Sequence, residues 1–462
     1  MNNPLAPLHR ALADVVGADR VLTDPTERHV YGYDNSRKHH LPDAVVFALA
    51  EEEVRGIVDT CRAHRVPLIA RGRGTGTTGA AVPVRGGVVL SLERMRRILA
   101  VDPDNRLLRA EPGATNQDVQ QAAAAHGFFW APDPTSASYC SIGGNIAVNA
   151  AGPRAVKYGT VRENTLGLRA VTGRGDAIRT GTDTTKGAVG YDLTRLLIGS
   201  EGTLAIITQA TLKLTPQGTA RRTLRAIYRD MHGAAAAVSR IMAQPQTPCA
   251  LEFLDGAAIA MVPDFHKSLP AQAGGLLLIE VDGPEAAMND AVAAIAAAAR
   301  GPGLVECVAA GSEGEARALW AVRKALSPAL RTLAPNKLNE DVVVPVSRIP
   351  ELIAGLEALS RRFDIPIVNF GHAGNGNIHV NMLYDSRNPE QEQRARPCLS
   401  EIFDLVLRLD GTLSGEHGVG MEKRDYVARA IDPPTLALMR AIKAQFDPDG
   451  ILNPDKLFPQ NP

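Results

Sequence analysis

A glycine-rich run from Arg71 to Gly79 is the feature that most limits how this chain can fold. Its nine residues, Arg-Gly-Arg-Gly-Thr-Gly-Thr-Thr-Gly, include four glycines and three threonines. Glycine lets backbone N–H groups come close to an anion, and threonine adds hydroxyl donors. A turn that only reverses the chain is the alternative interpretation, but such a turn needs fewer glycines. We interpret the run as a loop that holds a pyrophosphate group.

The elements around this loop decide its type. Asp43–Leu49 is predicted to be a strand, Glu51–Arg65 a helix with one apolar face, and Val66–Ala70 a second strand, which together form a βαβ unit. Residues 74–79 match the G-x-G-x-x-G pattern, but a dinucleotide-binding fingerprint must open a helix. Here the next element is another predicted strand, Gly87–Ser91. The context therefore excludes a Rossmann fold with NAD.

Length and composition narrow the remaining choices. A chain of 462 residues is expected to form two or three domains. Its 50 basic and 50 acidic residues cancel, which argues against binding to nucleic acid or an anionic membrane. No apolar run is long enough to span a bilayer and Met1–Leu5 does not begin a signal peptide, so a cytoplasmic protein is expected. The five widely spaced cysteines are predicted to be free thiols.

Two histidines indicate a metal site. His372 and His379 flank an Ala-Gly-Asn-Gly-Asn-Ile run, with apolar residues in strand-like order on both sides. Asn-Gly turns favour a β-hairpin, here over Ile365–Tyr384. If the turn is centred between Asn375 and Gly376, the two histidines face each other with Cβ atoms roughly 4.5–5.5 Å apart. One divalent ion could then bind both rings, whereas the alternative is a pair of surface histidines.

The segment Ser414–Gly420, Ser-Gly-Glu-His-Gly-Val-Gly, adds a carboxylate and a third imidazole. Two histidines and one glutamate leave a coordination position open, as catalytic metal sites do. We therefore predict that the ligands are His372, His379 and Glu416. Zinc is the first choice, and manganese, cobalt or iron fit the same ligands. His417 is the predicted general base, because histidine fills that role most often.

Further glycine-rich segments follow in a definite order: Trp130–Ser136, Ser141–Gly152, Lys157–Thr160 and Leu197–Leu204. Each alone is common turn chemistry. Their order, with the closing Phe446–Leu457, resembles the flavoproteins of the vanillyl-alcohol oxidase and p-cresol methylhydroxylase superfamily. Within it, nearly the whole chain from Leu41 is similar to the FAD-linked D-2-hydroxyacid dehydrogenases. That family includes D-lactate and D-2-hydroxyglutarate dehydrogenases and the FAD subunit of glycolate oxidase.

The resemblance implies FAD as the cofactor. The FAD is expected to be noncovalent, because Arg71–Gly79 contains no histidine or cysteine, and Cys140 is the nearest residue that could attach it. The implied positions surround the pyrophosphate, the isoalloxazine and ribityl chain, and the adenosine half. They are Arg71, Gly72, Arg73, Gly74, Thr75, Gly76, Thr77, Thr78, Pro132, Asp133, Pro134, Thr135, Ser138, Gly143, Gly144, Asn145, Asn149, Gly159, Glu201, Gly202, Ile206, Ile207 and Asn453.

The expected fold class is α+β. A two-subdomain PCMH-type (p-cresol methylhydroxylase-type) FAD-binding domain is assigned to residues 1–215, and an α+β substrate domain with an antiparallel sheet and the metal hairpin to 216–395. Residues 396–462 are expected to complete the active site and the FAD domain. The second domain begins where alanine-rich helical stretches such as Glu285–Arg300 alternate with strands such as Gly275–Glu280.

The resemblance also locates binders of a substrate carboxylate. Trp320–Lys324 and Lys337–Val342 match positions where relatives place such groups. Arg323 and Lys337 are therefore predicted binders. Solvated surface charge is the alternative interpretation for Lys324, and less so for Arg323, because arginine can bind a carboxylate with two hydrogen bonds. Two further residues are predicted from spacing: Ser327, four residues beyond Arg323 on one helix face, and Asn381, two residues beyond His379 on one strand face.

These parts predict oxidation of a D-2-hydroxy acid, such as D-2-hydroxyglutarate or D-lactate, to the 2-oxo acid. His417 takes the hydroxyl proton, and hydride passes to flavin N5. Electrons then leave to an external acceptor, an electron-transfer flavoprotein or a quinone, and the protein is a possible homodimer. The alternatives are an oxidase that uses dioxygen and a glycolate oxidase-type FAD subunit.

Overall fold

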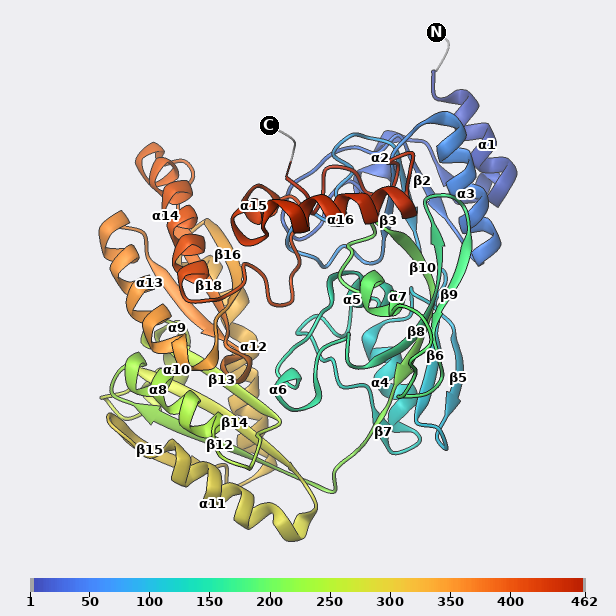
Figure 1. The fold of residues 1–462 in the computed structure, drawn as a ribbon. Coiled ribbons are helices and arrows are strands. Elements are labelled where there is room, and N and C mark those ends of the chain that lie inside the picture. Colours follow the sequence, from blue (N-terminus) through green and yellow to red (C-terminus); the bar gives the residue numbers. More distant parts are fainter. Residues whose placement is uncertain (1–3, 460–462) are drawn as a thin grey trace. The chain divides into compact units, whose positions relative to one another are not determined.

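The computed structural model describes residues 4–459; residues 1–3, which carry part of the N-terminal expectation, and 460–462 lie outside the description. The chain forms two compact units. Unit 1 comprises Met1–Ala151, Gly159–Gln217 and Glu416–Pro462, and unit 2 comprises Gly152–Tyr158 and Gly218–Gly415. Figure 1 shows the elements of both units, coloured by their position along the chain. Within residues 4–459, no helix is long and apolar enough to cross a membrane.

The first part of unit 1 is the predicted βαβ unit with an added strand. Its sheet has the order β1-β2-β4-β3, in which β2, β4 and β3 are parallel and β1 is antiparallel. Helix α3 buries Val54, Ile57, Val58 and Cys61, the apolar face that the helical spacing predicts. The strands are β1 (Val21–Leu22), β2 (Ala44–Phe47), β3 (Leu68–Arg71) and β4 (Val88–Ser91), and the helix is α3 (Glu51–His64).

The second part of unit 1 is an antiparallel sheet of five strands in the order β5-β6-β10-β8-β9, with a separate pair β11-β7. Buried side chains from α4, α5 and the sheet form one hydrophobic core around Trp130. The strands are β5 (Ile98–Asp102), β6 (Leu107–Ala110), β7 (Phe128–Phe129), β8 (Thr165–Thr172), β9 (Ala177–Gly181), β10 (Ala205–Lys213) and β11 (Thr215–Pro216).

The other helices of unit 1 lie at its chain ends and connections. They are α1 (Ala6–Val16), η1 (Ala18–Arg20), α2 (Pro25–His29), α4 (Asn116–Ala124), α5 (Ile142–Val148), α7 (Leu193–Leu197), η5 (Arg424–Tyr426), α15 (Val427–Ala430) and α16 (Pro433–Phe446). Helix α4 begins at a capping box in which Thr115 and Asp118 satisfy each other's backbone amides.

Unit 2 is built on one antiparallel sheet of seven strands, in the order β15-β12-β14-β13-β17-β18-β16. The predicted α+β class with an antiparallel sheet is confirmed. The strands are β12 (Ala220–Tyr228), β13 (Ala250–Asp255), β14 (Gly275–Gly283), β15 (Leu304–Ala309), β16 (Asn336–Val343), β17 (Ile367–Gly371) and β18 (Asn377–Tyr384).

Helices cover this sheet on both faces. Helix α8 packs on α11 and α13, and α13 packs on α14. Apolar residues of α9 and α12 join the sheet's other face in a single core that includes Leu254, Leu278, Phe370 and Leu326. The helices of unit 2 are α6 (Ala155–Tyr158), α8 (Met231–Met242), α9 (Gly256–Ala260), α10 (Pro263–Lys267), η2 (Glu285–Ala287), α11 (Met288–Ala299), α12 (Glu313–Leu333), η3 (Val346–Arg348), α13 (Ile349–Phe363), η4 (Ala373–Asn375) and α14 (Pro389–Arg408).

The unit boundaries differ from the sequence-based divisions in two places. The division placed at residue 395 falls inside α14, a continuous helix from Pro389 to Arg408, and the chain leaves unit 2 only after Gly415. Residues 152–158 interrupt unit 1, because Lys157 and Tyr158 bind Asp282 of β14 within unit 2. Composition does not show such a local exchange, since it depends on side-chain contacts between distant segments.

Candidate active site

The predicted hairpin that carries the two histidines is present, with a different register. Strands β17 and β18 pair antiparallel, but the 3-10 turn η4 joins them and Gly376 takes a left-handed φ of 75°. His379 pairs with Phe370, and the carbonyl of His372 accepts the amide of Asn377. The predicted face-to-face pairing of the histidines is therefore wrong. Their ring centroids still lie 5.1 Å apart.

The strand register brings further polar side chains to these histidines. Directly paired residues point to the same face of a sheet, and His379 is paired with Asp341 of β16 as well as with Phe370. On the other side, Phe253 of β13 pairs with Gly371. One step further along this register places Glu252 opposite His372. Sequence analysis missed Glu252, although an acidic residue inside the apolar strand Ala250–Leu254 was a signal.

Glu252 holds both a metal-ligand candidate and a substrate-binding candidate. Its side chain has no solvent exposure, and its Oε1 lies 2.5 Å from His372 Nδ1. Its Oε2 accepts Arg323 Nε at 2.6 Å. Burial pushes the pKa of Glu252 upward, but the opposing charges of His372 and Arg323 outweigh it and hold the pKa at about 2. Glu252 is therefore ionised between these two partners.

The predicted carboxylate binders occupy different environments. Arg323 is buried, with its guanidinium 4.9 Å from the Phe370 ring centroid and its Nε committed to Glu252. Lys337 Nζ lies 3.4 Å from Ser327 Oγ, so strand β16 and helix α12 bring a cation and a hydroxyl together. Lys324 is exposed, which agrees with its interpretation as surface charge.

The side-chain amide of Asn381 forms hydrogen bonds within the sheet. Its Nδ2 donates to the carbonyls of Val368 and His379, and its Oδ1 accepts Asn339 Nδ2 at 2.5 Å. Both amide hydrogens and the carbonyl oxygen are thus used inside the sheet, and the side chain is fully buried. These hydrogen bonds place Asn381 beside His379 and link β17, β18 and β16. Its predicted contact with substrate stays a prediction.

Asp341 anchors the chain just before Glu416. Its Oδ2 accepts the amide of Gly415 at 2.9 Å and the hydroxyl of Ser414 at 3.2 Å, and its Oδ1 accepts Asn377 Nδ2 at 2.6 Å. Its backbone carbonyl also accepts the Gly415 amide. Asp341 therefore positions Gly415, the last residue of unit 2, and Glu416 and His417 follow it directly in the chain. The sequence analysis did not predict this role of Asp341.

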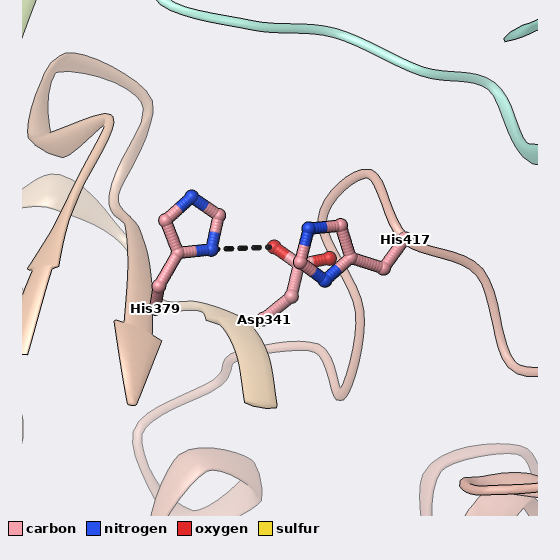
Figure 2. A group of neighbouring side chains, drawn as sticks. All are labelled: Asp341, His379 and His417. Carbon is pink, nitrogen blue, oxygen red and sulfur yellow. Dashed lines mark ion pairs between the residues drawn. The ribbon is translucent and has the colours of Figure 1, made fainter. Parts of the chain in front are cut away.

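Among the residues that the structure describes, two groups of three side chains could hold a metal ion: His372, His379 and Glu416, and Asp341, His379 and His417. Within each group the ligand atoms all lie within 4.8 Å of one another. Figure 2 shows the second group, with His379 Nδ1 directed at Asp341 Oδ1 across 3.9 Å. The Asp341 carboxylate already accepts three hydrogen bonds. The first group is the one that the sequence predicted.

The chemistry of the first group fits a divalent cation. Two imidazoles and one carboxylate suit zinc and its neighbours, and they leave a position for substrate. The hydrogen bond from His372 Nδ1 to Glu252 is the second contact that metal-bound histidines usually make. This observation supports a divalent metal ion at these residues.

In unit 1, the predicted pyrophosphate loop has the open backbone that a phosphate needs. A Cβ atom on Gly76 would meet only Asp34 Oδ2, at 3.9 Å, so this part of the loop faces free space. A Cβ on Gly72 would lie 2.2 Å from Ser141 Oγ and 3.9 Å from Gly144 Cα. The loop and the start of α5 thus approach each other closely only because glycines stand there. These residues fit an FAD pyrophosphate.

Several predicted FAD residues hold the loops together with their side chains. The Asn453 amide donates to the carbonyls of Ala80 and Glu201, at 2.9 and 2.7 Å. Asn149 has a left-handed φ of 54°, and its Oδ1 accepts the hydroxyl of Thr160 at 2.9 Å. The structure thereby unites segments that lie 250 or more residues apart in sequence.

Other predicted FAD residues have side chains that face elsewhere. Ile206 and Ile207 are buried in two separate hydrophobic cores. The guanidinium of Arg71 donates to the carbonyl of Tyr33 at 2.7 Å, so it links the start of the loop to the backbone at Tyr33. The Glu201 carboxylate accepts two amides of the segment after His417. The FAD contact predicted for these four residues stays a prediction. All five cysteines are free thiols, as predicted.

Comparison with known proteins decides the family. A model described as the FAD binding domain matches residues 42–181, and one described as the C-terminal domain of FAD linked oxidases matches residues 218–457. The chain belongs to the FAD-linked oxidase family. It is therefore an FAD-linked oxidoreductase, and the loops described above belong to the domain that this family uses for FAD.

Members of this family with assigned names match almost end to end. The glycolate oxidase subunit GlcD of Bacillus subtilis is 39% identical, over 97% of this chain and 96% of its own length. A D-2-hydroxyglutarate dehydrogenase of Stutzerimonas stutzeri is 34% identical over 97% and 98%, respectively. A D-lactate dehydrogenase of Anaerostipes hadrus is 32% identical over 96% and 94%.

The fold of this FAD-linked oxidase is shared more widely. The crystal structure of p-cresol methylhydroxylase superposes with a TM-score of 0.81 at 19% identity, covering 98% of this chain and 96% of that one. Alkyldihydroxyacetonephosphate synthase gives a TM-score of 0.75 at 20% identity, covering 99% and 86%. The predicted PCMH-type fold is confirmed.

Proposed function

We propose that this protein oxidises a D-2-hydroxy acid, D-2-hydroxyglutarate or D-lactate, to the 2-oxo acid with FAD and a divalent metal ion. The observation that carries the proposal is the grouping of His372, His379 and Glu416, with ligand atoms within 4.8 Å of one another, in an FAD-linked oxidase. Named relatives at 32–34% identity are D-lactate and D-2-hydroxyglutarate dehydrogenases. Two such different metabolites share only the 2-hydroxy acid group.

The bound cofactors supply a hydride acceptor at the flavin and a Lewis acid at the metal. The protein supplies orientation and proton transfer. Lys337 Nζ, with Ser327 Oγ 3.4 Å away, can receive a substrate carboxylate through a charge-assisted hydrogen bond and a hydroxyl donor. The terminal nitrogens of Arg323, whose Nε is held by Glu252, provide a second cation for that carboxylate.

His417 is the residue proposed to remove the hydroxyl proton at one of its ring nitrogens. Its backbone carbonyl accepts the hydroxyl of Thr78 at 3.4 Å, which ties it to the end of the glycine-rich loop in unit 1. A base placed by the same unit that would hold the flavin can take the proton while hydride leaves the α-carbon. The electrons then pass to an external acceptor such as an electron-transfer flavoprotein or a quinone.

The experiment is anaerobic reduction of the purified, FAD-loaded protein. D-lactate, D-2-hydroxyglutarate, D-malate and glycolate are added in separate samples under nitrogen, with L-lactate as the control. Bleaching of the flavin absorbance by a D-2-hydroxy acid and not by L-lactate is the expected result. The kcat/KM values with an artificial electron acceptor then rank the substrates. Absence of bleaching by every D-acid in FAD- and metal-replete protein would contradict the proposal.

A second candidate is an FAD subunit of a glycolate-oxidising complex. It is favoured by the 39% identity to a protein named glycolate oxidase subunit GlcD. Under this alternative, glycolate is the best substrate and the isolated chain passes electrons poorly to a dye. The same substrate panel separates the two, and consumption of dioxygen at the rate of flavin reduction would indicate an oxidase instead.

A further inference from the structure

The Glu252 carboxylate is buried among apolar side chains, where a charged group costs free energy. It lies in the middle of β13, and its neighbours in the sheet core include Leu254 and Leu278. Its side chain is completely buried. An isolated buried carboxylate costs several kcal/mol, so partners must compensate for the lost water. The two partners found are one from the metal hairpin and one from helix α12.

The two oxygens of Glu252 are divided between these partners. Oε1 lies 2.5 Å from His372 Nδ1, and Oε2 accepts Arg323 Nε at 2.6 Å. A carboxylate held by a guanidinium accepts hydrogen bonds and donates none. When the His372 ring is neutral, its proton is then on Nδ1 and its lone pair on Nε2. This is the tautomer in which Nε2 can bind a cation.

The sheet makes this contact rigid. Phe253 and Gly371 are paired in the register, so Glu252 on β13 and His372, which directly follows β17, lie close together and need no long side chain to meet. His379 Nδ1 lies 3.9 Å from Asp341 Oδ1, which is beyond hydrogen-bonding distance. Of the two imidazoles, His372 is the one that Glu252 contacts.

We propose that Glu252 is a positioning residue that holds His372 in the tautomer and orientation required to bind a divalent metal ion, and that Arg323 completes an Arg323–Glu252–His372 chain. The proposal rests on the metal site of the proposed function. It also gives Arg323 a role besides substrate binding. A simple structural ion pair predicts loss of stability without a specific loss of metal affinity.

The test is the dissociation constant of Zn²⁺ for the FAD-loaded protein, measured by competition with a chromophoric chelator and without substrate. The Glu252→Gln variant is expected to bind Zn²⁺ roughly 10–100-fold more weakly, the usual effect of removing such a partner. Flavin content is expected to stay at the wild-type level. The matched control is Glu280→Gln, which changes a buried carboxylate of the neighbouring strand β14 that bonds Trp320 Nε1 at 2.9 Å. It should leave the Zn²⁺ affinity within about two-fold.

Removing Glu252 alone also leaves the Arg323 charge without its partner, and that charge could itself repel a cation. The double variant Glu252→Gln/Arg323→Met separates the two effects. Affinity that stays low in the double variant supports positioning by Glu252, whereas affinity restored to wild type overturns it. If Glu252→Gln does not fold with flavin, the double variant decides by the same criterion. If neither folds, the Zn²⁺ affinity of Glu252→Asp is measured instead, because this variant keeps the charge on a shorter side chain. A weaker affinity supports positioning by Glu252, and an affinity equal to wild type overturns it.

The proposed function and this inference fail in different ways. A wild-type protein that binds no Zn²⁺, Mn²⁺, Co²⁺ or Fe²⁺ at all removes the metal site and with it the basis of the inference. A wild type that binds Zn²⁺ and a Glu252→Gln variant that binds it equally well overturn only the role of Glu252.

Discussion

The carboxylate of Glu201 accepts the backbone N–H of Gly420 at 2.7 Å. Its other oxygen accepts the N–H of Val419 at 2.6 Å, and the side chain is buried. A Cβ atom on Gly418 would lie 2.8 Å from this carboxylate, which explains the glycine there. His417 directly precedes this anchored stretch, and Gly415 is anchored by Asp341 in unit 2. The two candidate residues Glu416 and His417 are therefore fixed from both sides.

Replacing Glu201 should loosen the segment that carries His417. In Glu201→Gln, the NH₂ group faces a backbone N–H, and the lost acceptor is expected to cost about 1–3 kcal/mol. The thermal midpoint and the rate of flavin reduction should both fall. The control Glu111→Gln removes a buried carboxylate bonded to the Arg97 amide and should lower the midpoint alone. Reduction of Glu201→Gln at the wild-type rate would show that the anchor does not matter for catalysis.

Sequence patterns predicted what depends on neighbours along the chain. The apolar spacing of Val54, Ile57, Val58 and Cys61 gave α3, and the Asn-Gly turn gave the hairpin of β17 and β18. The predicted centre of the turn was wrong because η4 adds a 3-10 turn, and His379 pairs with Phe370 in place of His372. A shift in register changes every opposing pair.

What the sequence could not supply depends on contacts between distant residues. Glu252 meets His372 across 120 residues, and Asn453 meets Glu201 across 252. The members of each pair are too far apart in the sequence for helix or strand periodicity to predict their contact. Asn381 was placed on the correct strand and beside His379, but its amide is used by the sheet. The alternation of side chains along a strand therefore predicts the face of the sheet on which a residue lies, but not its hydrogen-bond partner.

The glycine loop leads to a prediction about FAD. A valine at position 76 should enter the open space beside the loop, where only Asp34 Oδ2 lies within 4 Å of a Cβ atom. Gly76→Val is therefore expected to fold but to purify colourless, without flavin. Gly187→Val, at a site where a Cβ meets only Thr182 at 3.7 Å, is the control and should remain yellow. Flavin absorbance relative to protein absorbance measures the outcome.

Noncovalent attachment of FAD is tested on the wild type. Acid precipitation should release all yellow colour into the supernatant, because the loop contains no histidine or cysteine and Cys140 is buried beside Asn145. Colour retained by the denatured chain would identify a covalent flavin, with Cys140→Ser as the first variant to examine.

The metal prediction concerns three ligands. His372→Ala, His379→Ala and Glu416→Ala should each lose stoichiometric metal and most turnover while they keep FAD, because each removes one of only three protein donors. His232→Ala, which changes a half-exposed histidine paired with Glu357, is the control and should keep both. EDTA should inactivate the wild type, and added Zn²⁺ or Mn²⁺ should restore it. Full activity in protein shown to be metal-free by elemental analysis would exclude the metal from the reaction.

Asp255 provides a test of stability against pH. Burial raises the pKa of Asp255 to about 6, although the amides of Ala258 and Asn369 donate to it. A carboxyl group with a raised folded-state pKa stabilises fully below its unfolded pKa, and this contribution is lost as pH rises through about 6. Asp255→Asn cannot titrate. Its thermal midpoint should therefore fall further below wild type at about pH 4.5 than at about pH 7.5, and an equal difference at both would contradict the assignment.

The last prediction concerns the base. If His417 accepts the hydroxyl proton, His417→Asn should slow flavin reduction by the substrate by roughly 10²–10⁴-fold, the usual contribution of a general base. FAD content and the affinity for Zn²⁺ should stay near wild type, because the predicted ligands are His372, His379 and Glu416. Anaerobic stopped-flow reduction measures the rate. A large loss of metal in His417→Asn would instead favour the second donor group, in which His417 joins Asp341 and His379 as a ligand. Reduction within a few-fold of wild type, with metal retained, would mean that another group removes the proton.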